Sequence, residues 1–171
     1  MTARFASPTA LADALTLLAA DVEARPVAGG TDLVVAARQG RRPLPPSIVA
    51  IDRIDALHQQ SVTDRGLELG ALTSHAWLAA NDDVRARWTA LADASAIVGS
   101  PATRGTGTIG GNLMNASPAA ETTAPLVVLD ATVELQSGTS SRSLPVGELA
   151  TGPGRTVAAA DELLVRVVIP P

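Results

Sequence analysis

A short strand that runs into a pair of glycines and then into a helix constrains the fold of this chain more than any other feature. Residues 25–28 form the expected strand, and two glycines follow directly. Thr31 and Asp32 can then cap a helix over residues 33–38. A second buried strand, residues 47–51, comes after a proline-rich stretch. Because a helix that connects two strands lets them pair in parallel, the sequence predicts a small βαβ-like lobe with parallel strands.

The rest of the chain predicts a second, larger lobe of short strands and helices. Many of its strands are separated by short turns, which favours a mainly antiparallel sheet. The expected fold class is therefore α+β, a single domain over residues 1–171 with lobe 1 at about 1–55 and lobe 2 at about 56–171. The expected elements are a hairpin over residues 61–69, helices at about 74–80, 83–98 and 119–129 (the last kinked or divided by Pro125), and strands over 132–136, 142–146 and 163–169.

Composition narrows the chemistry that the chain can perform. It has no cysteine, so it cannot form a disulfide, a thiolate metal site or an iron–sulfur cluster of its own. All 13 cationic residues are arginine, and without lysine neither a Walker A loop nor Schiff-base chemistry is available. A net charge of −4 argues against nucleic acid as a partner. No apolar run is long enough for a membrane span and the start lacks the apolar core of a signal peptide, so we expect a cytoplasmic location.

A glycine-rich stretch in the middle of the chain matches the consensus sequence of a dinucleotide-binding motif. Gly105, Gly107 and Gly110 have the spacing of the Gly-x-Gly-x-x-Gly motif. That motif needs a strand directly before it and a long helix that opens within it. Pro101 lies close in front, and Pro118 would break the helix after barely two turns. We therefore expect no Rossmann fold here.

Two glycine-rich segments nevertheless suit an anionic ligand. Residues 28–33 and 109–113 each place Gly-Gly before a small polar side chain and a leucine. Glycines let backbone N–H groups converge on a phosphate, and the first segment also opens a helix, whose N-terminus favours negative charge. Two such loops can clamp a pyrophosphate, with side-chain donors from Thr31, Thr108, Asn112 and Ser117. Alternatively, the first is only a tight turn and the second only a long irregular connection.

Few other side chains suggest chemistry. Glu121 follows the second loop and can accept hydrogen bonds from a ribose or an adenine amine, or else cap a helix N-terminus. His58 and His75 have no neighbours at metal-ligand spacing, so we expect both to be surface or structural residues. Arg104 can face a phosphate or a partner, although a solvated side chain is the simpler interpretation. We predict no catalytic acid or base and no metal site in this chain.

The two loops carry a resemblance to a known family. Residues 28–33 read Ala-Gly-Gly-Thr-Asp-Leu, residues 104–112 read Arg-Gly-Thr-Gly-Thr-Ile-Gly-Gly-Asn, and residues 116–121 read Ala-Ser-Pro-Ala-Ala-Glu. With these motifs the chain resembles the FAD-binding domain, or medium flavoprotein subunit, of the molybdenum hydroxylases, such as carbon monoxide and xanthine dehydrogenases. Lesser matches at 70–73, 129–131 and 161–170 extend the resemblance over nearly the whole chain. It implies a two-lobed FAD-binding fold of the PCMH/vanillyl-alcohol-oxidase type, with FAD between the lobes.

The same resemblance implies which residues hold FAD. One loop lies on each side of the pyrophosphate, Val98 lies near the flavin, Leu164 packs near the ring system or adenine, and Glu121 stands where the family has an aspartate at the adenosine part. Gly105 replaces an asparagine common in the family. The family also continues into a C-terminal domain, so we expect either a fragment or a short homologue with a more open site. The implied cofactor-binding residues are Pro26, Val27, Ala28, Gly29, Gly30, Thr31, Asp32, Leu33, Val98, Thr108, Ile109, Gly110, Gly111, Asn112, Asn115, Ser117, Glu121 and Leu164.

Finally, the resemblance implies an electron-transfer role. In the family, a molybdopterin-binding large subunit oxidises the substrate and a small subunit with [2Fe–2S] clusters carries the electrons. FAD then passes them to an acceptor such as NAD⁺, a quinone or oxygen, which is chemistry that the cofactor performs. Two other interpretations stay open. The chain could be a stand-alone flavin oxidoreductase of related fold, or a scaffold subunit that binds no flavin.

Overall fold

A computed structural model describes residues 4–171, and its first sheet has three parallel strands. The strands are β1 (Arg4–Ala6), β2 (Ala24–Val27) and β3 (Ser47–Ala50), in the order β1-β3-β2. The predicted parallel pairing of the second and third is therefore confirmed. The edge strand β1 was not predicted, because it is only three residues long and its one large apolar side chain, Phe5, is exposed.

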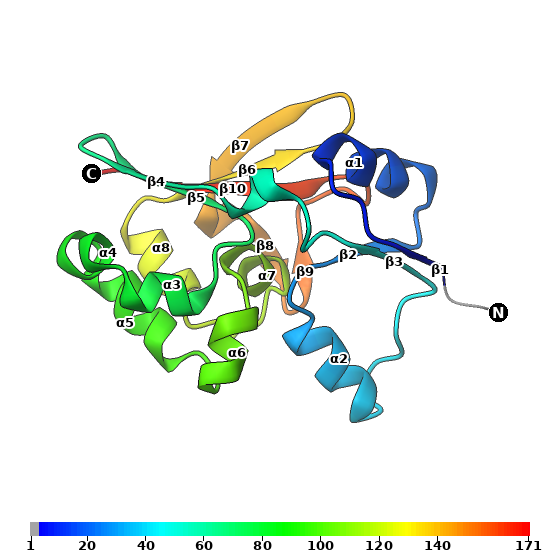
Figure 1. The fold of residues 1–171 in the computed structure, drawn as a ribbon, viewed down its shortest axis with the longest axis horizontal. Coiled ribbons are helices and arrows are strands. Elements are labelled where there is room, and N and C mark those ends of the chain that lie inside the picture. Colours follow the sequence, from blue (N-terminus) through cyan, green and yellow to red (C-terminus); the bar gives the residue numbers. More distant parts are fainter. Residues whose placement is uncertain (1–3) are drawn as a thin grey trace.

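Two helices lie on opposite sides of this sheet (Figure 1). Helix α1 (Leu11–Ala20) buries a stripe of apolar side chains at helical spacing. Helix α2 (Thr31–Arg38) has no buried residue. It begins at Thr31 and its N-cap is Gly30 in the left-handed region, with φ of 66°. The prediction that Thr31 and Asp32 cap a later helix was therefore wrong, since both belong to the first turn and neither side chain makes a capping hydrogen bond.

The second sheet has five strands and is antiparallel throughout, which confirms the α+β class. Its two hairpins turn where the sequence predicted them. In spatial order the strands are β4 (Gln60–Thr63), β5 (Gly66–Gly70), β10 (Leu163–Ile169), β6 (Thr132–Gln136) and β7 (Ser141–Pro145). A separate small hairpin, β8 (Ala150–Gly152) and β9 (Arg155–Thr156), was not predicted.

Six short helices gather beside this sheet (Figure 1). The helix predicted at 83–98 is two helices that meet at Trp88, and the one predicted at 119–129 begins only at Thr123. Pro125 lies in the first turn of that helix, where an N–H has no helical partner, and so it does not divide the helix. The helices are α3 (His75–Ala80), α4 (Asp82–Arg87), α5 (Thr89–Ile97), α6 (Pro101–Thr106), α7 (Ile109–Met114) and α8 (Thr123–Val128), and the 3-10 turns are η1 (Asp55–His58) and η2 (Val146–Glu148).

Strand β10 joins two hydrophobic cores. Leu163 and Val165 pack into the core under α1, whereas Leu164 packs into the core under α3 to α8. A bulge between Leu164 and Arg166 changes the alternation of the strand. After the bulge, Val167 and Ile169 also face the second core. Both faces of one strand are therefore buried, and the two sheets are fixed to each other through it.

Candidate cofactor-binding cleft

A cleft of about 1310 Å³ lies where the two sheets and their helices meet. Its walls come from the turn between β2 and α2, the loop over residues 41–46, the segment from α6 to α7, and the stretch over residues 151–162. Most of the residues predicted to bind a cofactor line it: Pro26, Val27, Ala28, Gly29, Gly30, Thr31, Asp32, Leu33, Val98, Thr108, Gly111, Asn112, Asn115 and Glu121. The cleft exceeds the roughly 300–1,000 Å³ of common small-molecule pockets, so it has room for a dinucleotide.

Four predicted residues do not line this cleft. Ile109 and Leu164 are fully buried in the core under α3 to α8, and Gly110 packs against Ala71. Ser117 lies in the turn after α7, and its hydroxyl accepts a hydrogen bond from the N–H two residues later. The structure therefore places these four behind or beside the cleft wall. Sequence order alone could not separate them from neighbours that face the cleft.

The first loop offers a set of backbone donors. Gly30 adopts φ of 66°, a conformation that glycine reaches without steric cost, and this turns the chain from β2 into α2. Among residues 4–171, no acceptor is found for the N–H groups of residues 29–33. These groups stand at a helix N-terminus, where the peptide dipoles also favour negative charge. An anion bound here would supply the missing acceptors.

The second loop uses its backbone donors internally. Thr108 caps α7, because its Oγ1 accepts the N–H of Gly111 at 3.1 Å. The N–H groups of Ile109 and Gly110 donate to backbone carbonyls in the turn after β5, each at 2.9 Å. The expectation that both loops present free N–H groups therefore holds only for the first. The second loop can contribute side chains, and it is a short helix rather than the irregular connection that the sequence also allowed.

The first loop contacts the end of α6, which leads into the second loop. A Cβ built on Gly29 would lie only 1.9 Å from the backbone oxygen of Thr106, at the end of α6. A Cβ on Gly107 would lie 3.6 Å from Oγ1 of Thr31 and 3.3 Å from Cδ2 of His75. The absence of side chains at these glycines therefore lets the two halves of the molecule meet. It also places the free donors of the first loop beside the second loop.

Asn112 in the second loop and Glu121 after it both line the cleft. The hydroxyl of the fully buried Thr122 donates to Oδ1 of Asn112 at 2.6 Å, which leaves the amide NH₂ of Asn112 available as a donor. Glu121 is partly buried and lines the cleft. It does not cap α8, whose N-cap residue is Thr122. A carboxylate is therefore presented to the cleft, where it can accept hydrogen bonds.

No sequence pattern indicated a functional role for His75, yet the structure places it in the cleft wall. The residue is only 1% exposed, and its Nδ1 has no partner among the described residues. Burial lowers the pKa of His75, while the negative charge of Glu121, the nearby backbone of Thr108 and the negative charge of Asp32 oppose this. The ring is therefore neutral at neutral pH. His58, by contrast, is exposed and bonded to the backbone, as a structural histidine would be.

Arg104 is half-buried and does not line the cleft. Its Nη1 donates to the carbonyls of Val98 at 3.2 Å and Gly99 at 3.0 Å, just after the end of α5. Charged donors satisfy such free carbonyls well. Arg104 is therefore not directed at the cleft, while a contact with a partner stays a prediction. Its hydrogen bonds fix the segment that brings Val98 to the cleft.

Comparison with known proteins supports a specific assignment. The family model described as "FAD binding domain in molybdopterin dehydrogenase" matches residues 1–171. The chain belongs to this family. Among curated relatives, the nicotinate dehydrogenase FAD-subunit of Eubacterium barkeri is 34% identical over 170 residues, which cover 96% of this chain and 57% of the relative. The glyceraldehyde dehydrogenase medium chain of Sulfolobus acidocaldarius is 32% identical, with 94% and 57% covered.

Solved structures of a quinoline oxidoreductase and a CO dehydrogenase share the fold. A chain of quinoline 2-oxidoreductase from Pseudomonas putida 86 superposes with a TM-score of 0.92 at 29% identity, covering 99% of this chain and 59% of that one. A chain of the reconstituted CO dehydrogenase from Oligotropha carboxidovorans gives 0.93 at 28% identity, with the same coverage. The family resemblance, the α+β fold and the cofactor FAD are thereby confirmed. The chain spans less than two thirds of the length of these relatives. Over residues 4–171, no helix is long and apolar enough to cross a membrane.

Proposed function

We propose that the cleft holds FAD with its pyrophosphate at the N-terminus of α2. The observation that carries this proposal is the row of N–H groups over residues 29–33 that lack an acceptor within residues 4–171. A pyrophosphate carries enough oxygens to accept several of these hydrogen bonds, and the helix dipole adds to the attraction. The left-handed Gly30 at the N-cap is what presents the row to the cleft.

The second loop would contribute side chains to the same ligand. The hydroxyl hydrogen of Thr108 and the NH₂ of Asn112 are both at the cleft wall and can donate. Glu121 can accept from the ribose or the adenine amine. Its negative charge would be unfavourable beside a phosphate, so we place it at the adenosine end. Leu164 lies in the core, and any effect on the ring system or adenine would pass through the residues that cover it.

We further propose that the chain acts as the flavin-carrying part of a molybdenum hydroxylase complex. FAD, when bound, supplies the redox chemistry, accepting electrons that originate at the substrate and releasing them to an external acceptor. The residues of this chain bind and orient the cofactor and exclude water from part of it. The proposed partners are a molybdopterin-binding large subunit and a [2Fe–2S] small subunit, with NAD⁺, a quinone or oxygen as the acceptor. Support comes from the relatives, which are named as FAD-subunits or medium chains of dehydrogenases.

A titration with FAD tests the placement of the cofactor. The purified chain should quench the fluorescence of added FAD, and its visible spectrum should show bound flavin. ADP should compete with FAD, because it carries the pyrophosphate and adenosine that we assign to the cleft, whereas riboflavin should compete poorly. Failure to quench FAD would overturn the proposal and favour a scaffold without flavin. Displacement by riboflavin but not by ADP would show that the main contacts to FAD are made at its ring system instead.

Co-purification distinguishes a subunit from a stand-alone oxidoreductase. A subunit should be recovered with a cysteine-rich iron–sulfur protein and a molybdopterin protein when expressed with its natural partners. An isolated chain that binds FAD and is reduced by a small organic substrate without partners would contradict the subunit role.

A further inference from the structure

One wall of the cleft is formed by a stretch without regular secondary structure. Residues 157–162 connect β9 to β10, and Ala158, Ala159, Ala160 and Glu162 line the cleft. Two backbone hydrogen bonds hold this stretch, from the N–H of Val157 to Leu149 at 2.9 Å and from the N–H of Glu162 to Ala159 at 3.1 Å. A segment with so few backbone bonds is expected to open easily unless side chains restrain it.

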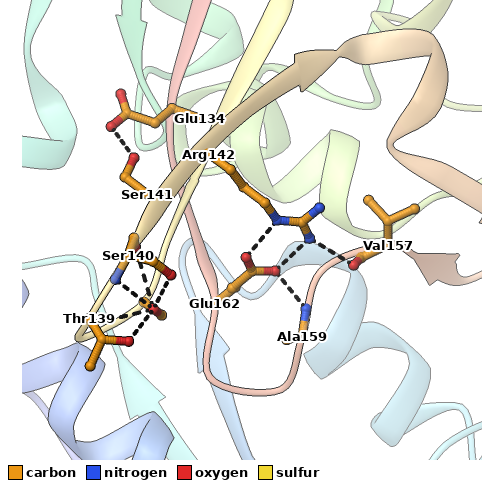
Figure 2. Close-up of polar contacts among 9 residues, drawn as sticks. Glu134, Thr139, Ser140, Ser141, Arg142, Val157, Ala159 and Glu162 are labelled. Carbon is orange, nitrogen blue, oxygen red and sulfur yellow. Dashed lines mark hydrogen bonds and ion pairs between the residues drawn. The ribbon is translucent and has the colours of Figure 1, made fainter.

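Arg142, on the neighbouring strand β7, supplies that restraint (Figure 2). Its Nε and Nη2 donate to the two carboxylate oxygens of Glu162 at 2.7 and 2.8 Å, a bidentate arrangement that fixes the mutual orientation of both groups. Nη2 also donates to the carbonyl of Val157 at 3.0 Å. One guanidinium therefore holds both ends of the stretch to the sheet.

Glu162 in turn binds the backbone of the cleft wall. Its Oε2 accepts the N–H of Ala159 at 2.8 Å, in the middle of the stretch. The side chain of Glu162 is only 9% exposed, against 47% for Arg142. The hydrogen bonds from Arg142 hold the pKa of Glu162 below its ordinary value, although burial acts in the opposite direction. The carboxylate thus stays charged at neutral pH and keeps all of these contacts.

We infer that Arg142 is a positioning residue for the cofactor cleft, holding the wall over residues 158–160 in place through Glu162. This rests on the proposed function of the cleft. Arg142 is not itself among the residues that line the cleft, so it acts through Glu162 and the backbone of Ala159. Without it the wall is free to move, and a ligand must order the wall as it binds. That ordering lowers affinity even though no contact to the ligand has been removed.

The matched control is Arg166 on β10. Its side chain is 50% exposed and pairs with Glu68 at 2.9 Å and Glu134 at 3.7 Å, on the same sheet but outside the cleft. Arg166→Met therefore removes the same charge from the same sheet, together with a more exposed ion pair. The test compares Arg142→Met, Arg142→Lys and Arg166→Met by FAD titration and by amide hydrogen exchange of residues 157–162.

Arg142→Met should weaken FAD binding by about tenfold, because the ligand must then order the wall. Arg142→Lys should fall in between, since lysine keeps the charge but not the bidentate geometry. Arg166→Met should stay within about twofold of the wild-type affinity, as an exposed ion pair remote from the cleft contributes little. Exchange at residues 157–162 should rise only in the Arg142 variants.

Two results would overturn the inference. One is unchanged exchange over residues 157–162 in Arg142→Met, which would show that the pair does not hold the wall. The other is faster exchange with unchanged FAD affinity, which would show that the wall does not matter for the ligand. If the wild-type chain itself fails to bind FAD while exchange responds to Arg142 as expected, the proposed cofactor is wrong and the restraint on the wall stands. The exchange measurement thus separates the two failures.

Discussion

Replacing Gly29 by alanine tests the contact on which the cleft depends. The new Cβ would lie 1.9 Å from the backbone oxygen of Thr106 and 2.6 Å from its carbonyl carbon, and real Cβ atoms essentially never come closer than 3.0 Å. Gly29 and the end of α6 must therefore separate by at least about 1.1 Å, the difference between 3.0 Å and 1.9 Å. Because the obstacle is backbone, no side-chain rotation relieves it. Overpacking of this kind costs about 1–3 kcal/mol.

Both stability and binding should respond to Gly29→Ala. The loss corresponds to a melting temperature lower by about 2–12 °C, at about 2–4 °C per kcal/mol for a chain of this size. A displacement of about 1 Å also lengthens hydrogen bonds between the loops and a shared ligand. Losing one charge-assisted hydrogen bond, worth about 1.5–3 kcal/mol, should weaken FAD binding by about 10- to 160-fold. Thermal unfolding by circular dichroism and FAD fluorescence quenching measure the two effects.

Gly105 provides the control for this substitution. It lies in α6, close to Gly29 in space and in the same glycine-rich stretch as the second loop, but a Cβ built on it meets nothing within 4 Å. Gly105→Ala should therefore be neutral or stabilise the chain by about 0.5–1 kcal/mol, since alanine loses less backbone entropy in a helix. If Gly29→Ala unfolds at the wild-type temperature and binds FAD as tightly, the close approach of the loops is not as described. Equal damage from both substitutions would refute the reasoning as well.

Three further predictions concern the polar groups of the cleft. Glu121→Gln should weaken FAD binding by roughly tenfold by fluorescence titration, whereas Glu121→Asp should retain binding; equal effects would exclude a role for the charge. Thr122→Val should lower the free energy of unfolding in urea by about 1–3 kcal/mol, because it removes the donor to Asn112; an unchanged midpoint would contradict this. Burial lowers the folded-state pKa of His75 from 6.5, so stability should be complete above pH 6.5 and fall as the pH drops toward the lowered value. His75→Gln should remove this loss of melting temperature and His58→Gln should not; the same acid sensitivity in both variants would assign it elsewhere.

The sequence predicted those parts of the fold that depend on local patterns. The strand over residues 132–136 alternates along its length, and the strand over 163–169 is apolar except for Arg166 and ends at two prolines, so both were found with their observed bounds. The two helices within residues 100–115 were not predicted, because glycine-containing helices of six residues have little intrinsic stability. They form here because Ser100 and Thr108 cap them and because the turn after β5 takes up the free N–H groups.

In the cleft, too, features set by local sequence could be predicted and features set by distant contacts could not. Its glycine loops could be found from the sequence because glycine spacing is a local property. The wall over residues 157–162 could not, since it depends on a bond between Arg142 and Glu162, which are 20 positions apart. The placement of His75 likewise involves a distant contact, since its backbone N–H donates to the carbonyl of Gly107 at 3.2 Å. Side chains whose role is set by such distant contacts leave no pattern in a single sequence.

Helix α2 has no buried residue, and its Val34 and Val35 are 41% and 47% exposed. Little packing therefore holds in place the helix whose N-terminus we assign to FAD. By linkage, a ligand that binds only the ordered helix also stabilises it. We therefore expect the fraction of molecules with an ordered α2 to rise with the supply of FAD. Binding of the cofactor would then complete the folding of lobe 1. Amide exchange in α2 that is equally slow with and without saturating FAD would contradict it.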